Sequence, residues 1–241
     1  SCLVDGNATI VIGRQTPGST VSNYFGTLLV GTLGVPSTLT ARPGAGVSPG
    51  GIAQLSFGNV DLGYANQSFR IQNQAGANCQ MVFNGVVGDS YGPQALVKDG
   101  DGGMLLLAAN TYRGGTVLSN GVLLVSNNTG SGTGTGDVTV WGGVLGGNGR
   151  IARSVVVKSN GVLAVGSSIG SLAISNTLTF EAGATNLVEV DLGTGTNDSV
   201  VGLTNVSYGG TLVVSNVGSQ PFTNGAALKI FDALTYSGAF A

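Results

Sequence analysis

Short runs of alternating hydrophobic and polar residues recur along most of the chain. Clear examples are residues 154–158, 172–175 and 177–180, which are rich in Val, Leu, Ile and Thr and lie close to Gly, Asn or Ser. An alternation with a period of two places successive side chains on opposite faces of a strand. The pattern therefore predicts many short β-strands joined by turns, and no helices.

A short phrase marks the start of several of these strands. Gly121, Gly143 and Gly161 each begin Gly-Val-Leu, at a spacing of about 20 residues that is typical of a solenoid coil. Asn-Gly at 120–121 and 160–161 would also suit two-residue hairpins, but both pairs precede the same phrase. Equivalent turns in successive coils explain this better. A β-solenoid of about 12 such coils would be a rod of about 60 Å, at roughly 4.8 Å per coil.

The first part of the chain is less regular than the rest. It holds Pro17, Pro36, Pro43 and Pro49, which are four of the six prolines. Because proline cannot donate a hydrogen bond to a strand ladder, we expect a Pro- and Gly-rich loop at 40–51. The predicted organisation is one continuous domain, with an irregular N-terminal β region at 1–92 and a β-solenoid repeat region at 93–241.

The composition supports stacking and excludes two classes of partner. The 241 residues include 43 Gly, 9 Lys and Arg, 11 Asp and Glu, and no His. Few charges suit stacked coils, since a column of like charges would repel, whereas Asn, Ser, Thr and Val stack without that cost. So few basic residues give no electrostatic basis for binding nucleic acid or membrane surfaces. The longest apolar run, 104–109, is too short to span a bilayer, so no membrane insertion is expected.

Two features of the chain bear on export. It begins at Ser1 without a signal-peptide pattern, so we expect any export signal to have been removed. Cys2 and Cys79 could form one disulfide in an oxidising compartment. Two free thiols agree equally well with the sequence.

Two glycine-rich segments resemble sites of known chemistry. Residues 166–170 match the Gly-x-Ser-x-Gly pattern of hydrolases, but the chain has no His to act as the base. Asp99 and Asp101 lie in a turn that could supply ligands to Ca²⁺, although the turn lacks the bidentate Glu of an EF-hand loop. Asp and Gly are common in ordinary turns, so a solvated turn is favoured here.

The remaining acidic cluster consists of Glu189, Asp191 and Asp198. Glu189 and Asp191 would face the same side of a strand, as a carboxylate pair of a polysaccharide-cleaving enzyme could. The basic residues that such a site needs are missing nearby, and a solvated face is favoured. We therefore expect no catalytic residues, no cofactor and no enzymatic activity.

The middle of the chain resembles a known repeat. Residues 105–117 read as a Leu-rich strand, then Asn-Thr-Tyr, a short gap and Gly-Gly-Thr, and glycine-rich phrases follow as far as residue 170. This order, over about half of the chain, resembles the autotransporter-associated β-strand repeat of bacterial surface proteins. The motif residues singled out are Asn110, Thr111, Tyr112, Gly114, Gly115, Thr116, Gly143, Gly146, Gly147 and Gly149.

The resemblance implies a right-handed parallel β-helix that is exported and displayed at a bacterial surface. We therefore expect an extracellular structural protein, as a module of a fibre, surface layer or adhesin. Its expected partners are other copies of itself, stacked head to tail, or other surface components. A module that binds carbohydrate or a host surface is the alternative, and a polysaccharide lyase or hydrolase is a more remote one.

Overall fold

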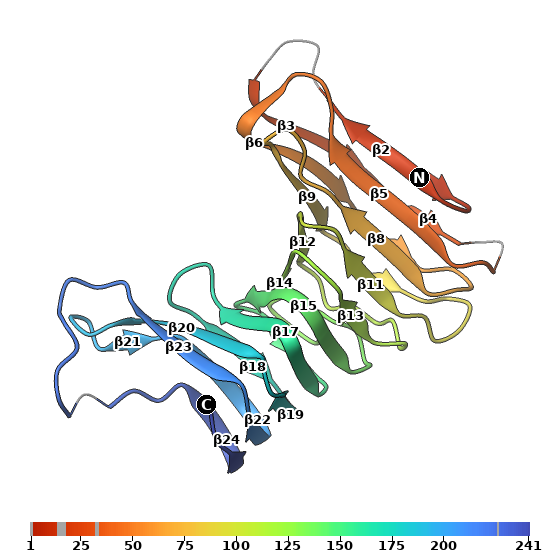
Figure 1. Ribbon diagram of the computed structural model, residues 1–241. Coiled ribbons are helices and arrows are strands. Elements are labelled where there is room, and N and C mark those ends of the chain that lie inside the picture. The colour runs from red at the N-terminus through yellow and green to blue at the C-terminus, as the bar shows by residue number, and fades with distance from the viewer. Residues whose placement is uncertain (1, 14–17, 32–33, 226) are drawn as a thin grey trace.

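The computed structural model describes residues 2–13, 18–31, 34–225 and 227–241, and all regular structure in these ranges is β-strand. The chain winds in coils, and each coil places strands on up to three faces (Figure 1). Within the described ranges every strand pairing is parallel except the β20–β21 hairpin. This arrangement confirms the all-β, β-solenoid prediction.

The strands group into three faces by their hydrogen-bonded neighbours. Face 1 contains β1 (Cys2–Val4), β4 (Leu28–Val30), β7 (Val60–Asp61), β10 (Val87–Gly88), β16 (Arg150–Ile151), β18 (Ser171–Ile174) and the first part of β22 (Ser199–Tyr208). Face 2 contains β2 (Ala8–Ile12), β5 (Ser37–Pro43), β8 (Gln67–Ile71), β11 (Leu96–Asp99), β13 (Thr116–Leu118), the first parts of β15 (Val138–Gly147) and β17 (Val155–Val165), β19 (Thr177–Phe180), the second part of β22, and β24 (Phe231–Gly238).

Face 3 completes each coil. It contains β3 (Gly18–Phe25), β6 (Val47–Phe57), β9 (Asn78–Phe83), β12 (Gly103–Leu106), β14 (Val122–Val125), the second parts of β15 and β17, β20 (Thr185–Asp191) and β23 (Thr211–Asn216), while β21 (Thr196–Asn197) folds back on β20.

The coils are fewer and less uniform than the repeat suggested. Face 2 stacks ten strands from the described residues, not twelve. Leu96 pairs with Thr116, 20 residues on, and Val138 with Val155, 17 residues on. Near the N-terminus, however, Ala8 pairs with Leu39, 31 residues on. The period of about 20 residues therefore holds only in the middle, where the Gly-Val-Leu phrase occurs.

The predicted loop at 40–51 was wrong. Pro43 is the last residue of β5 and pairs with Ile12, while Pro49 lies inside β6. The register between β3 and β6 shifts where Gly18 pairs with Val47 and Thr20 with Ile52. This irregularity accommodates Pro49 without a ladder hydrogen bond from its nitrogen, since prolines in sheets occur at strand ends and bulges.

The core consists of columns of inward side chains that pass from coil to coil. Almost all are apolar and fully buried, as the alternation predicted. One column on face 2 includes a lysine among aliphatic and aromatic residues. Its members are Leu39, Phe69, Lys98, Leu118, Val140, Val157 and Phe180.

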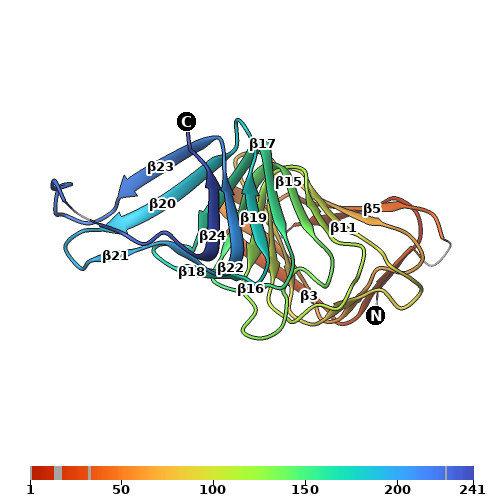
Figure 2. The same cartoon turned by 90° about the horizontal axis from the view of Figure 1, so that it is seen from below.

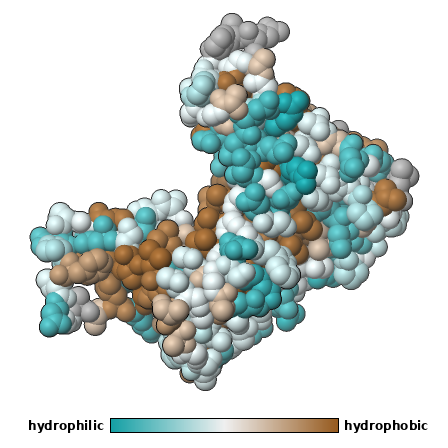
Figure 3. Space-filling view, in the orientation of Figure 1, coloured by the Kyte–Doolittle hydropathy of each residue, from teal (hydrophilic) through white to brown (hydrophobic). Residues whose placement is uncertain are grey.

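The stack of coils is bent. In Figure 1 the early coils (β2 to β9) and the late coils (β18 to β24) form two arms that meet near β12 to β15. Figure 2 shows β20, β21 and β23 reaching beyond the body of the stack on one side. Figure 3 shows a hydrophobic area in the angle between the two arms.

Candidate functional site

The outer side of face 3 carries aliphatic side chains in register from coil to coil. Leu105 pairs with Leu124, and the same position continues to Leu187 and Val213 by way of the small residues Gly146 and Ala164. A parallel row contains Val122, Val144 and Val162. We call these outward rows the outer aliphatic ladder; its members are half-buried, and Val213 is 42% exposed.

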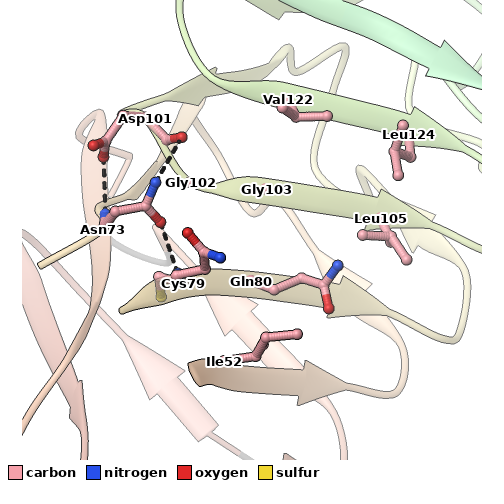
Figure 4. A pocket seen from close by; sticks show the side chains of 11 residues that line it. Ile52, Asn73, Cys79, Gln80, Asp101, Gly102, Gly103, Leu105, Val122 and Leu124 are labelled. Carbon is pink, nitrogen blue, oxygen red and sulfur yellow. Dashed lines mark hydrogen bonds between the residues drawn. The ribbon is translucent and has the colours of Figure 1, made fainter. Parts of the chain in front are cut away.

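A cavity of about 280 Å³ lies at the end of this ladder (Figure 4). Ile52, Leu105, Val122 and Leu124 contribute apolar side chains from successive strands. The polar side chains lie at one edge of the cavity, mainly on the turns that lead into β9 and β12: Asn73, Asn78, Gln80 and Asp101. An apolar floor with a few polar groups at its edge is the usual form of a binding depression.

Asn73 and Asp101 hold that polar edge in place. The Asp101 carboxylate accepts a hydrogen bond from the Asn73 backbone N–H at 2.8 Å, and the Asn73 side chain accepts one from the Cys79 N–H at 2.7 Å (Figure 4). Burial raises the pKa of the Cys79 thiol to about 11. A thiol that stays protonated near neutral pH is a poor nucleophile.

The proposed disulfide is not formed. Cys2 and Cys79 are both free thiols. Cys2 lies in β1 on face 1, and Cys79 lies in β9 on face 3, two coils further along. Of the two interpretations of the sequence, the structure has the one with unpaired cysteines.

The turn proposed for Ca²⁺ is organised around Lys98. The buried Lys98 ammonium donates to the carbonyl oxygens of Asp99, Gly100 and Asn120 at 2.9, 2.7 and 3.0 Å. The Asp99 carboxylate faces outward and pairs with Arg70 at 2.8 Å. Burial alone would raise the pKa of Asp99, but the Gly100 N–H and Arg70 together hold that pKa below its ordinary value. A protein ammonium therefore occupies the carbonyl cluster that a cation would use.

The Gly-x-Ser-x-Gly segment and the acidic cluster are brought together, which the sequence did not indicate. Ser167, Ser168, Glu189 and Asp198 line one small cavity of about 100 Å³. The buried Asp198 carboxylate accepts the N–H groups of Gly170 and Glu189 at 2.8 and 2.7 Å, although burial still raises its pKa. Asp198 thus joins two segments, as a capping carboxylate does.

Asp191, the third acid of that cluster, closes a turn. Its carboxylate accepts the N–H of Gly193 at 2.8 Å and that of Thr194 at 3.3 Å. This is the Asx geometry typical of tight turns. Among the described residues, no group of three or more His, Cys, Asp or Glu side chains could hold a metal ion.

The residues of the Asn-Thr-Tyr motif join coils. Asn110 accepts the Val87 N–H at 2.7 Å and donates to the Gly132 carbonyl, so it connects its own coil to both neighbours. Thr111 donates its N–H to Val87. Tyr112 is fully buried, and its hydroxyl lies 2.6 Å from that of Thr116.

The motif glycines lie where coils approach closely. A Cβ on Gly114 would lie 2.3 Å from the Gln94 carbonyl carbon, and one on Gly147 would lie 2.1 Å from the Val125 carbonyl oxygen. Gly146 and Gly149 are similarly close to the neighbouring coils, and Gly115 has a φ of +88°. The motif therefore specifies stacking and supplies no reactive group.

The comparisons with known proteins agree with a surface location. The chain is 32% identical over 130 residues to "Adhesin BmaC autotransporter" of Brucella suis biovar 1 (strain 1330). The match covers 53% of this chain and 4% of the length of that protein. No family model matches the chain, so membership of the repeat family stays a prediction. Within the described residues, no helix is long and apolar enough to cross a membrane.

Proposed function

We propose that this chain is an extracellular structural module of a bacterial surface adhesin, a solenoid segment that presents contact surfaces along its length. The outer aliphatic ladder carries the proposal. It runs along face 3, and a contiguous exposed apolar patch marks a contact site on soluble proteins. The distant likeness to an autotransporter adhesin supports the surface location, and the motif resemblance favours right-handed winding.

Surface display and adhesion test this proposal. Antibodies against the chain should label intact cells of the bacterium that encodes it, and beads coated with the purified chain should adhere to cultured host cells. Leu105→Ser combined with Leu124→Ser should reduce bead adherence severalfold, because both side chains belong to the ladder. The matched control is Leu3→Ser with Val11→Ser, which removes two exposed aliphatic side chains from faces 1 and 2. Unlabelled cells, or an equal loss in the control, would contradict the proposal.

We also propose that copies of the chain stack end to end. Among the described residues, β2 and β3 pair only with the next coil inward, and so does β23, while β24 pairs only with β22. Their outer edges are open parallel templates of the kind that recruits further strands.

The average mass in sedimentation should therefore rise with concentration. Lysine blunts strand edges, so Val11→Lys with Leu234→Lys should restore the mass of one chain. Both side chains are exposed, at 49% and 82%, so the double variant should keep its fold. A single-chain mass of the unmodified protein at every concentration would refute the stacking.

We further propose that the chain has no catalytic role. The acids that could act in hydrolysis are engaged by backbone N–H groups, as at Asp191 and Asp198. If polysaccharide cleavage is nevertheless measured, Glu189→Gln with Asp191→Asn should abolish it.

A further inference from the structure

A second row of outward side chains runs along the end of face 2. Each member directly follows a residue of the core column that contains Lys98, so each comes from a different coil and all point outward. We call this row the charged ladder. Its members are Arg70, Asp99, Ser119, Trp141, Lys158 and Glu181.

Neighbouring members of the charged ladder compensate one another. Arg70 pairs with Asp99 at 2.8 Å, and Lys158 forms an ion pair with Glu181. The Lys158 ammonium also lies over the Trp141 ring, 5.2 Å from its centroid, within the range of a cation–π contact. The ladder is therefore dense in charge and yet has no net charge.

Trp141 is the single Trp of the chain and is 57% exposed. It lies at a register shift, where the one residue between Val140 and Gly142 in β15 faces two in β17, Lys158 and Ser159. Such irregularities re-aim side chains and are common beside functional sites. More than half of a large aromatic surface is thus held in solvent beside a fixed ammonium and carboxylate.

The ladder adjoins a polar depression on the earlier coils. The depression measures about 530 Å³, and its lining includes Gln72, Gln74, Asp101 and Asn120. Asn120 directly follows Ser119, the ladder member on the coil before Trp141. From Arg70 to Glu181 the row crosses six coils, so the strip is about 24 Å long at roughly 4.8 Å per coil. Amide, carboxylate, ammonium and guanidinium groups line its whole length.

We propose that this strip binds a neutral oligosaccharide. The apolar face of a pyranose ring would stack on Trp141, and its hydroxyls would donate to Glu181 and Asp99 and accept from Lys158 and Arg70. A neutral chain is preferred over an anionic one because both ion pairs are internally compensated, which leaves no positive charge unpaired along the ladder. This inference deepens the adhesin role proposed above, because it names the class of ligand.

The single Trp provides a direct readout. Titration of the purified chain with cellohexaose and chitohexaose should change the Trp141 fluorescence saturably, whereas a galacturonic acid hexamer should have a much smaller effect. By calorimetry, Trp141→Ala should weaken binding by about tenfold or more, as truncation of an aromatic anchor does. Glu181→Gln should weaken binding less, because the amide keeps one acceptor. Tyr24→Ala, which removes another exposed aromatic residue on face 3, should bind as the unmodified chain does.

Three results would overturn the inference. They are no fluorescence change and no heat with either neutral hexamer, wild-type affinity in Trp141→Ala, or preferential binding of the anionic hexamer. Circular dichroism of each variant separates lost binding from lost folding. The result is independent of surface labelling, so failure of the saccharide site and failure of the adhesin role are distinguishable.

Discussion

Lys98→Met should lower the free energy of unfolding by about 3 kcal/mol at pH 7, because it leaves three carbonyl oxygens without their donor. Met fills much of the space of the lysine stem, so the loss reports the ammonium and not a cavity. Urea unfolding measures the change. The matched control is Lys229→Met, since Lys229 is an exposed lysine paired with Asp232, and it should change stability much less. Equal losses in the two variants would refute the role assigned to Lys98.

The pH dependence of stability gives Lys98 a second signature. Burial lowers the pKa of Lys98 from 10.5 to about 8. Between these two values the unfolded chain binds the proton more tightly than the folded chain, so the contribution of Lys98 to stability increases as the pH rises. The slope is at most about 1.4 kcal/mol per pH unit, and it vanishes below pH 8, where the amine is charged in both states. Lys98→Met should remove this rise.

Cys79 acts in the opposite direction. Burial raises the pKa of its thiol from 9.0 to about 11, so the unfolded chain releases its proton first and stability falls between these values. Cys79→Ala should remove that fall. Urea unfolding of both variants at pH 7, 9 and 10 would separate the two contributions. An unchanged alkaline slope in Lys98→Met would show that the lysine does not titrate in this range.

Gly143→Ala should destabilise the fold by about 3 kcal/mol. Gly143 has a φ of +76°, and a Cβ there would lie 2.3 Å from the Gly121 carbonyl oxygen on the preceding coil. Gly195 has a similar φ of +69°, but a Cβ added there would meet no atom within 4 Å. Gly195→Ala should therefore cost only about 1 kcal/mol, for the left-handed backbone alone.

The difference between the two variants measures the close approach of coils, separately from backbone preference. Thermal unfolding of each, compared with the unmodified chain, gives both values. Similar melting temperatures for the two variants would mean that the coils can move apart at little cost.

Much of the architecture could be predicted from sequence. The alternating runs and the repeated Gly-Val-Leu phrase specify short strands and equivalent corners, and these are local properties. Coil length is less accessible, because the residues from Ala8 to Leu39 and from Val138 to Val155 each complete one turn. The excess residues of the longer coils follow no period.

The main errors concern single residues whose role depends on neighbouring coils. Lys98 read as part of a hydrophilic turn, yet its position is inward, and only the carbonyls of the next coil make that burial possible. Asn186 likewise occupies a core column between Leu163 and Leu212, against the apolar pattern. The charged ladder was missed because its members are far apart in sequence and none belongs to a motif. Pairing across coils, which defines the ladder, is visible only in the fold.

The unequal coil lengths have a mechanical consequence. Hydrogen bonds between coils run along the stack, so a force that pulls the two ends apart would peel coils off one after another. A released coil of 31 residues, such as that from Ala8 to Leu39, adds up to about 110 Å of extended chain. One of 17 residues, from Val138 to Val155, adds about 60 Å. Under load the long terminal coils would thus absorb most of the extension while the short central coils remain stacked.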